Sequence, residues 1–337
     1  MNRFQVFPAL NIGNAHIRPR RLRINKNIRS LVQENKLQKS DLIFPLFISE
    51  KGTKRYEIPS LSGIFRIPYD ELLTEVEEIQ KLGIKAIMLF PVIEGTKKDD
   101  YGTEAYNPEG LMQNCIRKIK ETFPNMILFV DVALDPYTLH GHDGIIDEKG
   151  YVLNDETVEA LCKQSLSYAA CGVDFVCPSD MMDGRIAAIR TILDKDGYIG
   201  TSILAYSAKF ASAFYGPFRE AIASGARGLD KKTYQLNPAN SREAIREAIL
   251  DIQEGADMVM VKPGLPYLDI LSKIKSQSEV PVVIYQVSGE YAMLKCAAQN
   301  NLIDEKAAVY ESLISMKRAG ADLIVTYYAK WLCENLL

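Results

Sequence analysis

Two lysines in this chain stand at the ends of apolar segments, where an amine could react covalently with a ketone. Lys262 closes the run Met258–Val261, and Lys209 follows Tyr206-Ser207-Ala208. Loss of solvation lowers the pKa of such a lysine, and a second ammonium group in the same pocket lowers it further. The neutral amine is the nucleophile that forms a Schiff base. Because a single lysine of this kind is more often a snorkelling or ion-paired side chain, the hypothesis of amine catalysis rests on the pair.

Other polar residues occur where they could serve the same reaction. Asp131 interrupts the apolar string Phe129-Val130-Asp131-Val132 and is a candidate for proton transfer or for stabilising an iminium ion, the alternative being a simple ion pair with a lysine. Arg219, Lys231 and Gln235 follow Lys209 in a long segment. They could bind a substrate carboxylate, although a solvated loop of mixed charge has the same composition.

The elements that position these residues follow a repeated pattern. From residue 41 onward, short apolar or β-branched runs alternate with segments of helical periodicity, which is typical of βα units. Eight such runs are candidate strands: Asp41–Ile48, Ala86–Val92, Met126–Leu134, Asp174–Ser179, Ile199–Ser207, Met258–Pro263, Val280–Ser288 and Asp322–Ala329. On this pattern Lys262, Ser288 and Tyr327 lie at or near strand ends, where barrel enzymes carry their active sites.

Helices are expected between these strands. The clearest candidates, with apolar residues three and four apart, are Tyr69–Leu82, Asp155–Ala170, Arg242–Gly255 and Glu305–Ala319. The pattern predicts one (β/α)₈ TIM barrel over residues 41–337, preceded by an extended N-terminal arm over residues 1–40. An open doubly wound sheet is the alternative, but the Gly-rich phosphate-binding turn that such sheets normally carry is not found.

Composition excludes several function classes. The net charge is only −3 and the cationic residues form no stripe, so we expect no nucleic-acid partner. The longest apolar runs are shorter than the roughly 20 residues of a membrane helix, so we expect no membrane span. Six cysteines without a Cys-x-x-Cys pair argue against disulfides and thiolate metal cages, and they fit a reducing cytoplasm.

The N-terminal region carries a cluster of arginines and no acidic residue before position 34: Arg18, Arg20, Arg21 and Arg23. An excess of arginine without acidic residues is also typical of an organelle transit peptide. The region contains a single serine, two prolines and no helical apolar face. We therefore favour a basic arm that binds a neighbouring subunit.

Taken together, several long strings resemble the porphobilinogen synthase (5-aminolevulinate dehydratase) family. They are the two lysine segments, the arm Arg18–Arg23, Asp131–Tyr137, Pro178–Arg185 and Tyr285–Tyr291, in the family's order and over nearly the whole chain. The resemblance implies a lyase that condenses two 5-aminolevulinate molecules to porphobilinogen with loss of two waters, an early step of tetrapyrrole biosynthesis.

The resemblance also implies roles for the candidate residues. Lys262 and Lys209 each form an imine with one substrate molecule. Ser288 and Tyr327 hold the carboxylate of the molecule on Lys262. The carboxylate of the molecule on Lys209 is held by Arg219 and Lys231, with Gln235 nearby. The family commonly has arginine where this chain has Lys231, so the bidentate geometry of a guanidinium is lost there.

Metal dependence and assembly are further implications of the resemblance. Zinc-dependent members carry three cysteines where this chain has Ala133, Asp135 and Asp143, so active-site Zn²⁺ is not expected. The two aspartates could hold Mg²⁺ or only bond to neighbouring groups. Glu247 is implied as an outer ligand of an activating, allosteric Mg²⁺ at a subunit boundary, and the arm points to a homo-octamer built from dimers.

Two other functions stay open from the sequence. A class I aldolase uses the same Schiff-base chemistry but needs only one imine lysine. A catalytically silent barrel that serves as an assembly module would leave both lysines as rim charges.

Overall fold

A computed structural model describes residues 17–50, 52, 54–222 and 230–337 of the chain. By its internal contacts the chain divides into two units, Met1–Lys36 and Leu37–Leu337. The barrel expected from residue 41 onward therefore lies wholly within the second unit. In the described part of the chain, no helix combines the length and the apolar character needed to cross a lipid bilayer.

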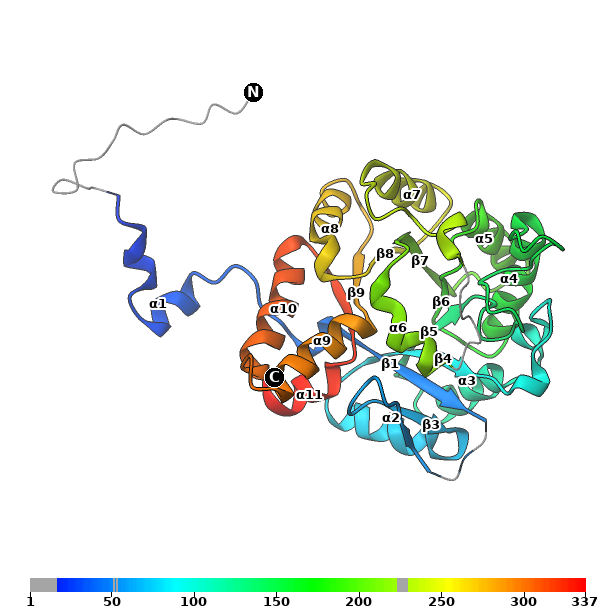
Figure 1. The fold of residues 1–337 in the computed structure, drawn as a ribbon, viewed down its shortest axis with the longest axis horizontal. Helices are drawn as coiled ribbons and strands as arrows, with labels where there is room; N and C mark the ends of the chain where they lie inside the picture. The colour runs from blue at the N-terminus through cyan, green and yellow to red at the C-terminus, as the bar shows by residue number, and fades with distance from the viewer. Residues whose placement is uncertain (1–16, 51, 53, 223–229) are drawn as a thin grey trace. The chain divides into compact units, whose positions relative to one another are not determined.

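Eight parallel strands close into a barrel (Figure 1). They are β1 (Leu42–Ser49), β4 (Ala86–Val92), β5 (Ile127–Val132), β6 (Phe175–Pro178), β7 (Ser202–Lys209), β8 (Met258–Lys262), β9 (Val282–Gln286) and β10 (Leu323–Thr326). Each strand pairs with the next in sequence, and β10 pairs back to β1 through Leu42 with Ile324 and Ile43 with Val325. This closure confirms the (β/α)₈ prediction and excludes the open sheet, which would have two edge strands.

Helices follow the strands, and most of them surround the barrel, whereas the short helix Gly216–Ala221 lies inside this ring, over the strand ends (Figure 1). They are α2 (Leu72–Lys81), α3 (Leu111–Thr122), α4 (Asn154–Ala169), α5 (Arg185–Lys195), α6 (Gly216–Ala221), α7 (Arg242–Gln253), α8 (Leu268–Lys275), α9 (Ser288–Gln299), α10 (Glu305–Ala319) and α11 (Ala329–Asn335). In α2 the fully buried apolar residues Leu72, Val76 and Ile79 recur at helical spacing. Such a stripe packs the helix onto the barrel.

Smaller elements lie between the main ones. A short antiparallel pair, β2 (Tyr56–Glu57) and β3 (Phe65–Pro68), adds to β1 and was not expected from the sequence. The 3-10 helices of the barrel unit are η3 (Lys39–Asp41), η4 (Tyr69–Glu71), η5 (Gly95–Lys97), η6 (Thr103–Tyr106), η7 (Ala213–Tyr215), η8 (Lys231–Thr233) and η9 (Leu265–Tyr267).

The first unit contains two short helical segments, η2 (Pro19–Arg23) and α1 (Lys26–Leu31). Asn25 caps α1, since its side chain accepts a hydrogen bond from the Ile28 backbone N–H at 3.0 Å. Neither segment contains a buried residue. Residues 1–16 of the predicted arm lie outside the described residues.

Three predicted strand boundaries are wrong near the site. The eighth barrel strand was predicted over Asp322–Ala329 but ends at Thr326, so Tyr327 follows the strand. The seventh barrel strand ends at Gln286, so Ser288 is the first residue of α9 and not the last of a strand, because Glu290 accepts the Val287 N–H at 2.8 Å and starts the helix. The fifth barrel strand runs over Ser202–Lys209, whereas the prediction was Ile199–Ser207. Its pairing with β8 continues past an irregularity after Ala205, so Lys209 is part of the strand.

Candidate active site

Lys209 and Lys262 are the last residues of the adjacent strands β7 and β8, and they are partners in the register of that pair. Their relative exposures are 7% and 6%. Both lysines therefore stand side by side at the carboxyl ends of the barrel strands. This is the juxtaposition that the sequence predicts for amine catalysis.

One cavity of about 30 Å³ collects most of the candidate residues. Its lining is Asp131, Asp135, Ser179, Lys209, Tyr215, Phe218, Arg219, Lys231, Gln235 and Lys262. A space of this size holds a few water molecules at most. Two keto acids can enter only if lining side chains move apart.

The Lys262 amine lies in an aromatic enclosure. Its Nζ is 5.0 Å from the ring centre of Tyr206, 5.3 Å from that of Tyr215, 5.1 Å from that of Phe218 and 4.6 Å from that of Tyr285. Burial, and next the positive charge of Lys209, lower the pKa of Lys262 to about 7. A large fraction of this amine is therefore the neutral nucleophile near neutral pH.

Lys209 has a polar setting instead. Its Nζ donates to Asp143 Oδ2 at 2.8 Å and to the backbone carbonyl of Ser179. Asp143 also accepts a hydrogen bond from Lys231, and it is 1% exposed. Burial alone would raise the pKa of Asp143, but the two lysine charges and their hydrogen bonds hold it well below the usual range. Asp143 is thus a permanent anion between two ammonium groups.

Asp131, the polar residue of the third barrel strand, is buried and lines the cavity. Burial, and next the negative charge of Asp135, raise the pKa of Asp131 to about 7, against the opposing charges of Lys262 and Lys209. It forms no ion pair with either lysine. A carboxyl group that is half protonated near neutral pH can act as general acid and general base in turn.

The predicted carboxylate anchors fall into two groups. Arg219 on α6, Lys231 on η8 and Gln235 line the cavity beside Lys209. Lys231 is engaged with Asp143 and, at 3.5 Å, with Asp135. A substrate carboxylate that binds Lys231 must therefore compete with two aspartates.

Ser288 and Tyr327 do not line the cavity. The Ser288 hydroxyl accepts the Phe218 N–H at 3.0 Å and donates to the Phe214 carbonyl at 3.3 Å. The Tyr327 hydroxyl lies 3.2 Å from that of Tyr285. The Phe218 ring packs edge-on against Phe90 with centroids 5.2 Å apart. The one proton of the Ser288 hydroxyl is thus engaged by the Phe214 carbonyl in η7, and this bond must break before the serine can donate to a carboxylate.

A sequence model of the delta-aminolevulinic acid dehydratase family matches residues 16–335 of this chain. The chain belongs to the delta-aminolevulinic acid dehydratase family. A delta-aminolevulinic acid dehydratase of Bradyrhizobium diazoefficiens is 50% identical over 98% of this chain and 92% of the relative. A chloroplastic delta-aminolevulinic acid dehydratase of Physcomitrium patens is 49% identical over 97% of this chain and 77% of the relative.

A solved structure agrees with this assignment. The delta-aminolevulinic acid dehydratase (porphobilinogen synthase) of Toxoplasma gondii ME49, determined in complex with its reaction product porphobilinogen, superimposes with a TM-score of 0.92. The two sequences are 55% identical, and the match covers 94% of this chain and 91% of that one. The resemblance inferred from the sequence is confirmed, and the protein is a lyase, a 5-aminolevulinate dehydratase.

In this dehydratase family member, the three positions at which zinc-dependent relatives were expected to carry cysteine are Ala133, Asp135 and Asp143. Asp143 uses both carboxylate oxygens for Lys209 and Lys231, and Asp135 also faces Lys231. No group of three or more potential metal ligands (His, Cys, Asp or Glu) clusters anywhere in the part of the chain described. The charges of Lys209 and Lys231 thus balance those of Asp135 and Asp143, the two carboxylates that could otherwise bind a metal ion.

Glu247 lies on α7, which precedes β8, as predicted. It borders a surface cavity of about 720 Å³ together with Glu243 and Arg246. Burial, and next the nearby Asp251 carboxylate, raise the pKa of Glu247. Two arginines, Arg242 and Arg246, line the same cavity as the two glutamates, so the charges of its lining balance. Protein donors alone would leave most positions of an octahedral Mg²⁺ to water, which is common for this ion.

The aromatic residues that enclose Lys262 were not among the site residues predicted from the sequence. Tyr206 precedes Lys209 by three residues and Phe218 belongs to α6, so neither is near Lys262 in the sequence. A usable signal was present, because Tyr206 and Tyr285 are the aromatic residues of two strands whose other apolar residues are aliphatic. A buried tyrosine usually needs a hydrogen-bond partner for its hydroxyl group, so its position in a strand is informative.

Proposed function

We propose that this dehydratase binds two 5-aminolevulinate molecules side by side and forms one Schiff base on Lys262 and one on Lys209. The observation that carries the proposal is the register pair of two enclosed lysines, one of which has a pKa of about 7. Only a reaction that holds two carbonyl substrates at once needs two such amines. The aldolase alternative needs one.

The chemistry follows from the neutral amine. Lys262 attacks its substrate ketone carbon as the free amine, and Lys209 attacks the other after its ammonium group has given a proton to a base such as the nearby Asp131 carboxylate. In each case the carbonyl oxygen leaves as water. The imine acidifies the adjacent carbon, so the adduct on Lys209 loses a proton and becomes an enamine whose carbon attacks the second substrate. Asp131 holds or releases the proton at this stage. The lysines return as free amines when the pyrrole forms, so two substrates yield one porphobilinogen and two waters.

The carboxylates of the two substrates need separate anchors. Arg219 and Lys231, with the Gln235 amide beside them, supply positive charge next to Lys209. Ser288 and Tyr327 supply hydroxyl donors for the molecule on Lys262. In this proposal the small cavity is the closed state of the site, and substrate entry exchanges the hydrogen bond that Ser288 donates to the Phe214 carbonyl for one that it donates to the substrate carboxylate.

Borohydride reduction followed by peptide mass spectrometry tests the proposed function. With 4-oxopentanoate, the same keto acid without its amino group, we expect reduced adducts on Lys262 and on Lys209. Lys262→Met and Lys209→Met should each abolish pyrrole formation from 5-aminolevulinate. Retained turnover in either variant would favour a one-lysine aldolase, and an unmodified wild-type protein would favour a silent barrel.

For metals, we propose that no zinc is needed in the active site and that Mg²⁺ activates the protein at Glu247. The first part is supported by Lys209 and Lys231, which both form ion pairs with Asp143 and balance its negative charge. Carboxylates also prefer Mg²⁺ to softer Zn²⁺. The second part is supported by the carboxylates of Glu243 and Glu247, which border the same surface cavity.

For assembly, we propose a homo-octamer built from dimers, in which the arm binds an adjacent subunit. The described part of the arm exposes several large apolar side chains: Ile17, Leu22, Ile24, Leu31 and Val32. Such residues on a basic segment suit a protein surface more than water. Removal of residues 1–36 should reduce the octamer to smaller species in sedimentation. A truncated protein that still sediments as an octamer would contradict the proposal.

For location, we propose the cytoplasm. All six cysteines are free thiols, which suits a reducing compartment. The Physcomitrium patens relative carries a chloroplastic name, and a plastid is the competing location. Imaging of the full chain with a C-terminal fluorescent tag distinguishes the two, and signal confined to plastids would contradict the proposal.

A further inference from the structure

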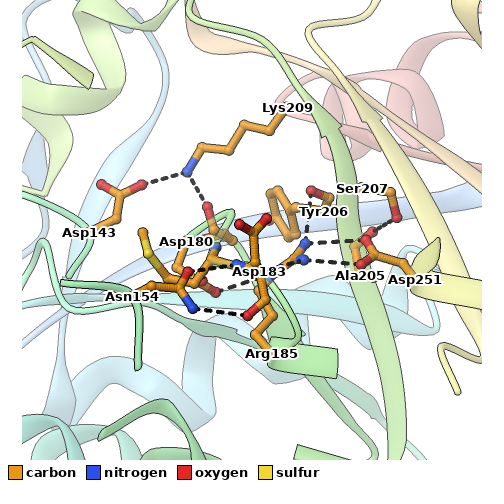
Figure 2. A network of polar contacts seen from close by, with 12 residues as sticks. Asp143, Asn154, Asp180, Asp183, Arg185, Ala205, Tyr206, Ser207, Lys209 and Asp251 are labelled. Carbon is orange, nitrogen blue, oxygen red and sulfur yellow. Dashed lines mark hydrogen bonds and ion pairs between the residues drawn. The ribbon is translucent and has the colours of Figure 1, made fainter. Parts of the chain in front are cut away.

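Arg185, the first residue of α5, is a buried cation outside the lining of the active-site cavity. It is 2% exposed, and its guanidinium donates to both carboxylate oxygens of Asp251 on α7, at 3.0 and 3.2 Å (Figure 2). Burial of a guanidinium is costly unless it is paired and hydrogen-bonded. The planar bidentate geometry of this pair fixes the orientation of the Arg185 side chain.

The same guanidinium reaches the two chain segments that position Lys209. It donates to the Tyr206 carbonyl in β7 at 3.4 Å and to the Met182 carbonyl in the loop after β6 at 3.3 Å. Its Nε faces Asp180 Oδ2 at 3.6 Å. Arg185 therefore joins the strand that carries Lys209 to the loop that lies beside it.

The contact to Tyr206 falls on a β-bulge. Ala205 pairs with Val259 and Ala208 pairs with Val261, so three steps along β7 match two steps along β8. The extra residue brings Lys209 opposite Lys262. A slip of one residue would bring Ala208 there and turn the Lys209 side chain to the other face of the strand. Bulges commonly redirect a side chain next to an active site.

The contacts of Arg185 to the loop after β6 lie next to the residue that accepts a hydrogen bond from Lys209. The Ser179 carbonyl accepts from the Lys209 ammonium group. The next residue, Asp180, is fully buried and accepts the Met182 N–H at 2.7 Å. Met181 between them has a φ of 71°, a left-handed conformation that residues other than glycine rarely adopt. Such a turn persists only where its surroundings enforce it, and Arg185 is one of its partners.

We propose that Arg185, oriented by Asp251, is a positioning residue for the Schiff-base amine of Lys209. It acts by securing the β7 bulge and the Ser179–Asp180 turn, and it does not touch substrate. The inference rests on the proposed function, because it assigns a support to one of its two lysines. It predicts that loss of the Arg185 contacts impairs the Lys209 subsite and spares the Lys262 subsite.

The test compares adduct formation at the two lysines in the full-length protein. Wild type, Arg185→Lys and Asp251→Asn are incubated with 4-oxopentanoate and borohydride, and the modified peptides are quantified. Lysine keeps the charge but cannot make the bidentate pair. We expect the rate of adduct formation at Lys209 to fall by about 10- to 100-fold, the order of loss for a reacting group misplaced by about 1 Å. The rate at Lys262 should stay as in wild type.

Glu75→Gln is the matched control, because Glu75 is similarly buried and pairs with Arg55 and Lys330 at 2.8 Å each, away from the cavity. It should lower the melting temperature without changing the ratio of the two adducts. Asp251→Asn is the second test variant and serves if Arg185→Lys does not fold. An unchanged adduct ratio in the folded variants would overturn the inference. Absence of a Lys209 adduct in wild type would overturn the proposed function instead.

Discussion

Lys262 lies opposite Lys209 in the register of β8 against β7, and the charge of Lys209 is the second cause, after burial, of the low pKa of Lys262. The two lysines differ in their surroundings. Lys262 sits among aromatic rings without an ion pair in the part of the chain described, whereas Lys209 is bonded to Asp143. One amine is therefore prepared as a free base, and the other is held in place by a carboxylate.

Replacement of Lys209 by methionine should raise the pKa of Lys262, because a repelling positive charge is removed. An amine is reactive above its pKa, so the pH at which borohydride trapping on Lys262 is half-maximal should move upward from about 7. Lys232→Met is the control, since this lysine is exposed and does not line the cavity. A profile that moves to lower pH, or does not move, would contradict the proposed electrostatic link.

Replacement of Asp131 by asparagine should separate imine formation from later proton transfer. The amide cannot exchange protons, so we expect turnover to pyrrole to fall by about 10²- to 10⁴-fold, the usual contribution of general acid–base catalysis. Reduced adducts on Lys262 should still form. Turnover equal to wild type would show that Asp131 takes no part in proton transfer.

Replacement of Asp143 by asparagine should destabilise the fold. The variant leaves Lys209 and Lys231 as buried cations without their shared anion, a change that costs about 3–5 kcal/mol in the free energy of unfolding. Chemical denaturation at neutral pH measures the loss. Thr138→Val, a change of a buried hydroxyl nearby, serves as a comparison, and we expect it to cost less, about 1–3 kcal/mol.

The same anion predicts how acid acts on the protein. The pKa of Asp143 is lower in the folded chain than in the unfolded one, so its stabilising effect is fully present above the ordinary aspartate pKa of about 4 and is lost as pH falls toward the folded-state value. Below pH 4 the wild-type protein should lose stability more steeply than Asp143→Asn. Parallel acid-unfolding curves for the two proteins would contradict this assignment.

Metal dependence is open to a direct assay. Pyrrole formation should survive a zinc-selective chelator, should rise on addition of Mg²⁺, and should not rise on addition of Zn²⁺. Glu247→Gln should remove the response to Mg²⁺ and keep the basal rate, because Glu247 is absent from the active-site cavity lining. Loss of all activity in the zinc chelator would overturn the proposal of a zinc-independent site.

The sequence by itself determined the barrel and indicated that Lys209 and Lys262 lie at the ends of neighbouring strands. Alternation of apolar runs with amphipathic segments depends only on burial, so strand β4 and helix α10 were predicted at their observed bounds, Ala86–Val92 and Glu305–Ala319. Lys209 and Lys262 were identifiable because burial of a charged residue at the end of an apolar strand costs free energy, and such residues at the strand ends of a barrel are commonly catalytic.

Only the tertiary structure decided how these residues meet. The bulge in β7 is invisible in the sequence, yet it sets which residue lies opposite Lys262. The aromatic enclosure, the partners of Ser288 and the link from Arg185 to Tyr206 join segments that are far apart in the chain. Periodicity reports which residues are buried, whereas register and long-range pairing depend on the packing of the whole barrel at once.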